Sequence, residues 1–123
     1  IFHCEGDEAV LEDITEFLIK NKRIVYHLYR SADRALVEMY LMRICEQVIL
    51  SYIHDNHGDL SVSPEDKTII VRYYKCQCFG MIIDWLNSDM RFDIAAEARR
   101  MYELRKGMLE EIVRRASMQR SKA

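Results

Sequence analysis

The chain has few of the residues that build turns: among its 123 residues are one proline and four glycines. Folds rich in β-strands and loops need many such residues, because tight turns depend on their backbone geometry. The composition therefore excludes a β-rich architecture. Half of the residues are hydrophobic and 31% are charged, which fits one globular domain over residues 1–123 and not a disordered chain.

The chain also lacks a basic excess, a membrane-length apolar run and a visible signal peptide. Its formal net charge is -2, so it does not bind nucleic acid by itself, since phosphate binding requires clustered positive charge. Charged residues interrupt every stretch that approaches the roughly 18 apolar residues of a membrane span. We therefore expect a cytoplasmic protein with no membrane contact. Because the sequence starts Ile-Phe-His-Cys without an initiator Met, we expect a piece of a longer protein.

Motifs that carry catalysis are missing. There is no Gly-rich phosphate loop, no Gly-x-Ser-x-Gly elbow and no His-Glu-x-x-His. No glutamate has a histidine three residues later, as a di-iron helical bundle would require. The carboxylates are scattered over polar positions and nominate no general acid–base pair. The sequence therefore predicts no enzyme, no catalytic residue and no cofactor.

One pair of histidines leaves open the possibility of a metal-binding site. His54 and His57 are three residues apart near a predicted helix end, with Asp55 and Asp59 nearby. The favoured interpretation is that both are exposed histidines at a helix C-terminus, where positive charge is stabilised. A structural metal site requires four ligands, and the sequence offers only weak candidates for them, so we assign no metal.

The cysteines favour buried free thiols in a reducing cytosol over a redox or metal role. Cys76 and Cys78 are two positions apart on a predicted helix and point about 200° away from each other. They cannot pair or share a metal as a Cys-x-x-Cys loop does. Cys45 lies inside another helical run.

Apolar residues at three- and four-residue spacing predict an all-α fold. We expect an antiparallel bundle of four long helices and one short helix, at residues 7–20, 24–29, 34–56, 64 to 87–90, and 93 onward. Candidate caps support these boundaries: Asp7, Ser31 or Asp33, Gly58, Ser63 with Pro64 and Asp66, and Asp93.

The stretch from Ile69 to Leu86 is apolar nearly all round. Its apolar residues form three columns on a helix: Ile69, Tyr73, Cys76, Gly80 and Ile83; Ile70, Tyr74, Cys78, Met81 and Trp85; and Val71 with Ile82. A helix of this kind has to be buried on more than one side. In so short a chain, one of those sides is expected to meet a second copy.

We therefore expect a homodimer in which the last two helices of each chain build an isologous four-helix bundle. Gly80 has two readings, because a glycine inside a helix costs about 1 kcal/mol and usually needs a packing reason. It makes room either for the partner or for a neighbour in its own chain. The candidate interface residues are Phe79, Gly80, Ile83, Leu86, Met108 and Ile112.

An unusual supply of aromatic and methionine side chains suits a pocket for a small, mostly apolar effector between helices. Ordinary core packing would use the same residues, and for any single one it is the safer interpretation. The candidate lining residues are Phe17, Tyr26, Tyr29, Met39, Met42, Tyr74 and Cys78.

Three phrases resemble the C-terminal domain of TetR/AcrR-family transcriptional regulators: EFLIKNK at 16–22, YY at 73–74 and FGMIIDWLNSDM at 79–90. The last two look like the pattern of a bacterial TetR subfamily that includes dihydroxyacetone-kinase operon regulators. The resemblance covers essentially the whole chain, although its specific part is short. It departs at Asp89, where the pattern usually has Gly, and this leaves the end of the helix open.

The resemblance implies a sensor and dimerisation domain that controls DNA binding through an N-terminal helix-turn-helix absent from this chain. Two other classes stay open. One is a stand-alone helical homodimer that acts as a protein-interaction module. The other is a metal-sensing regulator that uses His54 and His57.

Overall fold

A computed structural model describes residues 16–31, 33–57 and 62–122, and every regular element in these ranges is a helix. Residues 16–20 are helical and lead into α2 (Lys22–Tyr29), α3 (Arg34–His57), α4 (Pro64–Asn87), α5 (Ile94–Leu104) and α6 (Met108–Lys122). The all-α prediction is confirmed. The expected caps Asp7 and Gly58, and Asp59 beside the histidines, lie outside the described residues.

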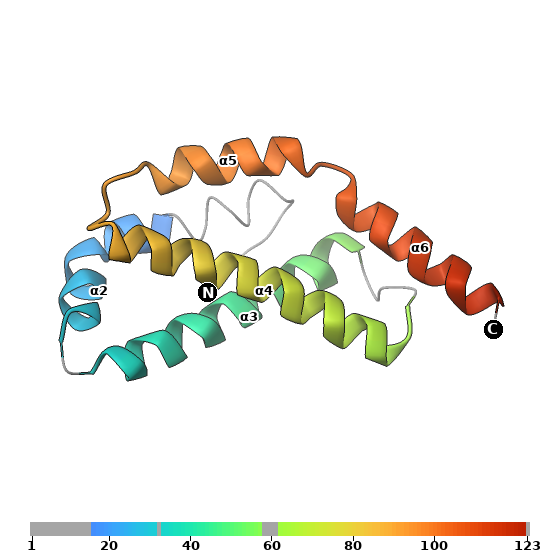
Figure 1. The fold of residues 1–123 in the computed structure, drawn as a ribbon, viewed down its shortest axis with the longest axis horizontal. Coiled ribbons are helices and arrows are strands. Elements are labelled where there is room, and N and C mark those ends of the chain that lie inside the picture. Colours follow the sequence, from blue (N-terminus) through green and yellow to red (C-terminus); the bar gives the residue numbers. More distant parts are fainter. Residues whose placement is uncertain (1–15, 32, 58–61, 123) are drawn as a thin grey trace.

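The two longest helices, α3 and α4, form an antiparallel hairpin (Figure 1). Two side-chain contacts fix its register: Arg34 donates to Asn87 at 3.0 Å, and Lys75 lies 3.7 Å from Glu46. Both pairs have residue numbers that add up to 121 (34 with 87, 46 with 75). A constant total is the signature of antiparallel neighbours, so any residue of α3 can be matched to its level on α4.

The core lies between these two helices and the segments packed on them. α3 contributes residues at helical spacing, and the second and third apolar columns of α4 face them. The buried hydrophobic residues of the pair are Val37, Leu41, Cys45, Val48, Ile49, Tyr52, Ile53, Ile70, Val71, Ile82, Trp85 and Leu86. The expectation that α4 turns one apolar side toward its own bundle is thus confirmed.

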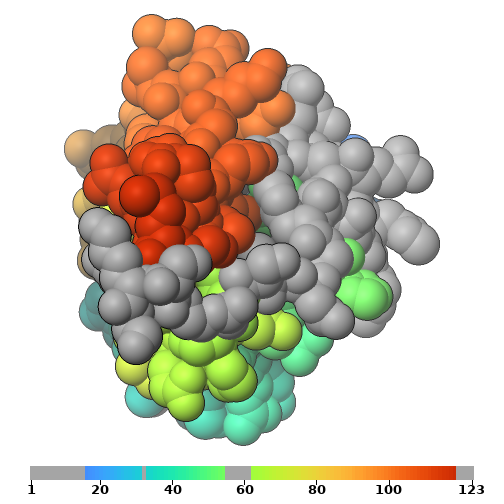
Figure 2. All heavy atoms as spheres, turned by 90° about the vertical axis from the view of Figure 1, so that its right-hand side faces the viewer, coloured from blue at the N-terminus to red at the C-terminus, as the bar shows by residue number. Residues whose placement is uncertain are grey.

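The helix α5 runs back along α4, as expected for antiparallel neighbours joined by a tight link (Figure 1). Figure 2 views the molecule from the side of α6 and shows α5 and α6 above α3 and the first turns of α4. Ile94, Ala98 and Leu109 are the buried residues that attach α5 and α6 to the core. α4 is therefore the central helix.

The prediction of one last helix from Asp93 onward was wrong: the segment is two helices, α5 and α6, separated at 105–107. Gly107 has φ +86°, a left-handed conformation that interrupts the helical hydrogen-bond ladder. The amide of Met108 donates to the carbonyl of Arg105 at 3.0 Å and restarts the chain in a new direction. The apolar spacing continues across this break, which is why the sequence pattern did not show it.

The other boundaries follow their capping chemistry. Ser63 accepts a hydrogen bond from the amide of Asp66 at 3.1 Å and Pro64 takes the first turn, so α4 begins as predicted. Asp93 caps α5 in the same way, at 3.0 Å from the amide of Ala96. At the predicted break before α2, the side chain of Asn21 donates to the carbonyl of Phe17 at 2.9 Å and closes the preceding helix.

Among the described residues, no helix is long and apolar enough to cross a membrane.

Candidate functional site

The first apolar column of α4 is exposed over most of its length, and only Ile83 at its end packs against the core. Ile69 is 60% exposed and Tyr73 is 55% exposed; Cys76 and Gly80 are also exposed, and Ile83 is half-buried. We call these five residues the outer face of α4. A run of large apolar side chains in water on one helix is costly, because burying such surface is worth about 25 cal/mol per Å². The outer face is therefore suited to contact another apolar surface.

Gly80 lies at the centre of the outer face in open space. A Cβ atom built on it would meet nothing within 4 Å among the described residues of its own chain. Among the described residues, Gly80 therefore has no intrachain neighbour that would explain a glycine at this position.

The other predicted interface residues lie at three different depths. Phe79 on α4 and Ile112 on α6 are half-buried, and Met108 at the start of α6 is exposed. Leu86 is 0% exposed, so its side chain belongs to the core of its own chain. Exposed apolar side chains also occur outside the predicted set, at Met101, Leu104 and Met118 on α5 and α6.

The predicted effector-lining residues fall into two groups. Met42, Tyr74 and Cys78 are half-buried and lie near the middle of the α3–α4 hairpin, as its register shows. Tyr26 and Tyr29 lie at the far end of α4, roughly 12–20 Å from the first group at 1.5 Å per helical residue. Phe17 is half-buried on the first helical segment, and Met39 is exposed on α3.

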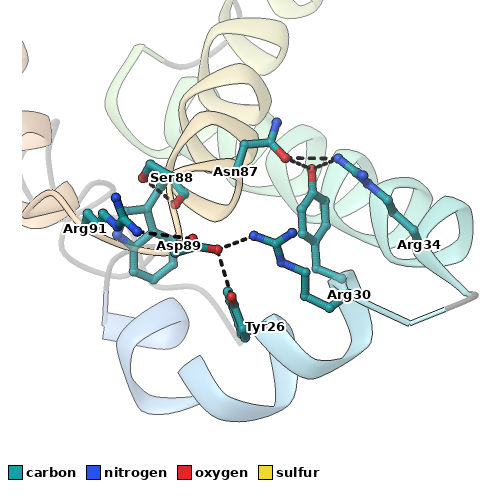
Figure 3. A network of polar contacts seen from close by, with 9 residues as sticks. Tyr26, Arg30, Arg34, Asn87, Ser88, Asp89 and Arg91 are labelled. Carbon is teal, nitrogen blue, oxygen red and sulfur yellow. Dashed lines mark hydrogen bonds and ion pairs between the residues drawn. The ribbon is translucent and has the colours of Figure 1, made fainter.

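The end of α4 is fastened to α2 by a polar cluster that we call the clasp (Figure 3). Tyr26 donates to a carboxylate oxygen of Asp89 at 2.8 Å, and Arg30 forms an ion pair with the same oxygen. The other carboxylate oxygen lies 3.7 Å from the guanidinium of Arg91. The guanidinium of Arg30 also covers the ring of Tyr26, at 5.3 Å from its centroid. Asp89 is thus surrounded by donors from both sides of the contact.

A second part of the clasp surrounds the buried ring of Tyr29, which is 1% exposed. Its hydroxyl donates to the side-chain oxygen of Asn87 at 2.6 Å, and Arg34 donates to both groups. The guanidinium of Arg34 stacks on the Tyr29 ring at 4.2 Å. Because its hydroxyl is occupied and its ring is covered, Tyr29 presents no free polar atom to a ligand in this arrangement.

The backbone of the clasp explains the departure from the family pattern at Asp89. Asp89 and Met90 have φ values of 58° and 59°, the left-handed region that glycine adopts without strain. The amide of Met90 donates to the carbonyl of Trp85 at 2.8 Å, which closes the helix end. The left-handed turn therefore forms without a glycine, and the Asp89 side chain at this turn contacts Tyr26 and Arg30.

The charge on Asp89 should make the clasp sensitive to acid. The hydrogen bond from Tyr26 and the charge of Arg30 hold the pKa of Asp89 below its ordinary value of 3.8. A depressed folded-state pKa stabilises the protein above the unfolded value and ceases to do so as the pH falls through the folded value. We expect Asp89→Asn, which tolerates the left-handed turn, to lower the thermal midpoint at neutral pH and to match the parent below the folded-state pKa.

Asp84→Asn is the matched control for that measurement, because Asp84 is an exposed carboxylate on the same helix. Its thermal midpoint should differ little from that of the parent at either pH. A constant difference between Asp89→Asn and the parent down to strong acid would contradict the role given to the Asp89 charge.

The sequence interpretation missed the clasp. A usable signal was present, since Tyr26, Tyr29 and Arg30 share one face of α2 by their spacing of three and four. What was missing was their partner, the Asn87–Asp89 segment, which lies 58 to 63 residues further along the chain. Only the packing of α2 against the end of α4 brings the two together.

The metal hypothesis gains no support from the described part of the chain. His54 is exposed, and no group of three or more His, Cys, Asp or Glu side chains there is arranged to hold a metal ion. The side chains of Asp55 and His57 lie outside the described residues.

The described residues form an all-α domain with an antiparallel central hairpin and an exposed apolar helix face. Residues 8–107 match the TetR_C_8 family model, described as the transcriptional regulator C-terminal region. The chain belongs to this family of TetR-regulator C-terminal domains. No curated protein and no solved structure matches it.

Family membership confirms two of the sequence predictions. It supports the TetR resemblance at the level of the family, and it confirms that the domain is not an enzyme, because the family is one of non-enzymatic regulators. The match ends at Gly107, where α5 gives way to α6. Met108 and Ile112, two predicted interface residues, therefore lie beyond the matched region.

Proposed function

We propose that residues 1–123 form the effector-sensing and dimerising domain of a bacterial transcriptional regulator. DNA would be bound through an N-terminal helix-turn-helix outside this chain, and the whole regulator would be cytoplasmic. The observation that carries the proposal is the outer face of α4, an exposed apolar surface on the central helix of a TetR-family C-terminal domain. Such a face fits a domain that works as a pair.

In the proposed homodimer, the outer face of α4 packs against its symmetry mate and the exposed side of α6 flanks it. An isologous contact places equivalent residues near the two-fold axis. Gly80 is at the centre of the face and has no neighbour within 4 Å of a built Cβ among the described residues, so two α4 helices can approach closely there. Phe79 and Ile83 border the contact, while Leu86 supports it from inside its own chain.

The Gly80→Ala variant tests whether this glycine is needed for the close approach of two α4 helices. In the isolated subunit, alanine should raise helix stability by about 1 kcal/mol, because no atom opposes its methyl group. In the dimer the two methyl groups should hold the α4 helices apart, so the dimer dissociation constant should rise. Analytical ultracentrifugation measures that constant, and an unchanged or tighter dimer would contradict a close approach at Gly80.

We propose that the effector is small and mostly apolar and binds near the middle of the α3–α4 hairpin, beside Met42, Tyr74 and Cys78. The half-buried state of these residues supports this level over the clasp, where Tyr29 is already covered. Effector binding would shift α4 between two bundle arrangements and change the spacing of the DNA-binding domains. The clasp would carry that movement to α2.

A matched pair of variants tests the site with the neutral dye Nile red as probe. Met42→Trp should fill the site and abolish the enhancement of dye fluorescence, whereas Met39→Trp adds the same ring at an exposed position on the same helix. Equal binding by both variants, with unchanged circular dichroism, would place the dye elsewhere. A dry and fully filled interior beside Tyr74 in a crystal structure would also reject the pocket.

Within the family, the resemblance of residues 73–90 favours the subfamily that includes dihydroxyacetone-kinase operon regulators. The alternative function is that of a stand-alone homodimeric interaction module without DNA binding. The upstream coding sequence separates this module from a regulator, because a helix-turn-helix of about 45 to 60 residues there would establish DNA binding.

A further inference from the structure

Two thiols on different helices meet in the middle of the α3–α4 hairpin. Cys45 on α3 is 1% exposed, and Cys78 on α4 is half-buried against the core. Cys78 packs against the buried cluster that contains Cys45, so both thiols belong to the contact between α3 and α4. The structure therefore pairs cysteines that are 33 positions apart in the sequence (78 minus 45).

The register of the hairpin supports this pairing independently. Contacts between Arg34 and Asn87 and between Glu46 and Lys75 place Cys45 at the level of residue 76 on α4. Cys76 is at that level and Cys78 is two residues further along, about 3 Å at 1.5 Å per residue, but the two point in nearly opposite directions. Cys76 is exposed, so Cys78 is the one that turns toward α3.

We propose that Cys78 and Cys45 form a peroxide-reactive pair that closes a reversible disulfide between α3 and α4. The thiolate of Cys78 attacks one oxygen of hydrogen peroxide, the O–O bond breaks, and water leaves after protonation. Cys78 is then a sulfenic acid. The sulfur of Cys45 attacks the sulfur of Cys78, the S–O bond breaks, and its proton leaves with the hydroxide as a second water. Two thiols are oxidised and one peroxide is reduced.

The environment gives the two sulfurs different roles. The hydrogen bond donated by Cys45 lowers the pKa of the Cys78 thiol, although burial opposes this. The same contact and the burial of Cys45 raise the pKa of the Cys45 thiol, which keeps its proton. Cys78, the more accessible of the two, is thus the attacking thiolate, and Cys45 is the resolving thiol.

Disulfide formation would also move the helices. The sulfurs of a disulfide are about 2 Å apart, closer than two hydrogen-bonded thiols, so α4 has to shift or rotate against α3. The thiol pair itself depends on neither an effector nor a dimer. Any consequence for signalling rests on the function proposed above, whereas the bond can be tested alone.

The test uses the Cys4→Ser/Cys76→Ser variant of the chain, which keeps only the proposed pair. Treatment with hydrogen peroxide should lower the intact mass by two hydrogens, remove both thiols from maleimide labelling and leave the protein free of intermolecular cross-links. Dithiothreitol should restore both thiols. Peptide mapping should find Cys45 joined to Cys78.

A matched comparison uses two chains in which Cys45→Ser keeps a hydrogen-bond donor at position 45, one retaining Cys78 and the other retaining Cys76 as its only cysteine. Dimedone should trap the sulfenic acid of Cys78 at least ~tenfold faster than that of Cys76, as expected if the hydrogen bond from position 45 stabilises the thiolate of Cys78. The proposal is overturned if the two-cysteine variant keeps both thiols, cross-links between chains, or accumulates sulfinic acid at Cys78 while Cys45 stays reduced. Equal trapping of Cys76 and Cys78 would also overturn it.

Discussion

Replacing Leu86 with alanine is expected to lower the free energy of unfolding by about 2–5 kcal/mol, the range for truncating a fully buried leucine. Leu86 is 0% exposed and lies in the core beside Trp85, which is also buried. The substitution removes buried methyl groups and leaves a cavity that the surrounding helices fill only in part. Urea denaturation followed by circular dichroism, at one fixed protein concentration, measures the loss.

The matched control is Leu50→Ala, the same truncation at an exposed position on α3. It should change the free energy of unfolding by no more than about 0.5 kcal/mol. If Leu86→Ala instead dissociated the dimer while leaving the unfolding of the subunit unchanged, Leu86 would be a direct interface residue. The core position given to it here would then be wrong.

Placing a carboxylate on the outer face of α4 is expected to abolish dimerisation. In Ile83→Asp, association would bury an unpaired charge, which costs several kcal/mol and raises the dissociation constant by two or more orders of magnitude. Size-exclusion chromatography with light scattering should show a monomer or an aggregate. Because Ile83 also touches the core, Ile69→Asp provides a second variant at a site that is 60% exposed within its own chain.

Leu36→Asp is the control for both variants, since it makes the same change at an exposed leucine on α3. It should remain a dimer. If Ile69→Asp and Ile83→Asp both kept the dimer with native helicity, the outer face of α4 would not be the interface. Dissociation by Leu36→Asp alone would move the interface to α3.

Sequence reasoning succeeded where one local signal decides the structure. Ser63, Pro64 and Asp93 carry their capping chemistry wherever the helix later packs, so the starts of α4 and α5 were predictable. It failed at Gly107, because glycine occurs both inside helices and at their ends. Only its left-handed backbone distinguishes the two cases.

In the candidate site, too, the features that depend on one helix were predictable and the contacts between distant segments were not. The apolar columns of α4 come from a periodicity along one helix, and they predicted that one side would remain without a partner in the chain. The contacts of Cys45 with Cys78 and of Tyr26 with Asp89 join distant segments. No pattern within a single helix contains them.

The sequence by itself determined an all-α domain with a central helix that is apolar nearly all round. It did so because helical periodicity and capping act over a few residues. The tertiary structure decided which column of α4 meets the core, that Leu86 lies inside, and that Gly80 faces open space. Those outcomes depend on the register and rotation of α4 against α3, which are fixed by packing across the hairpin.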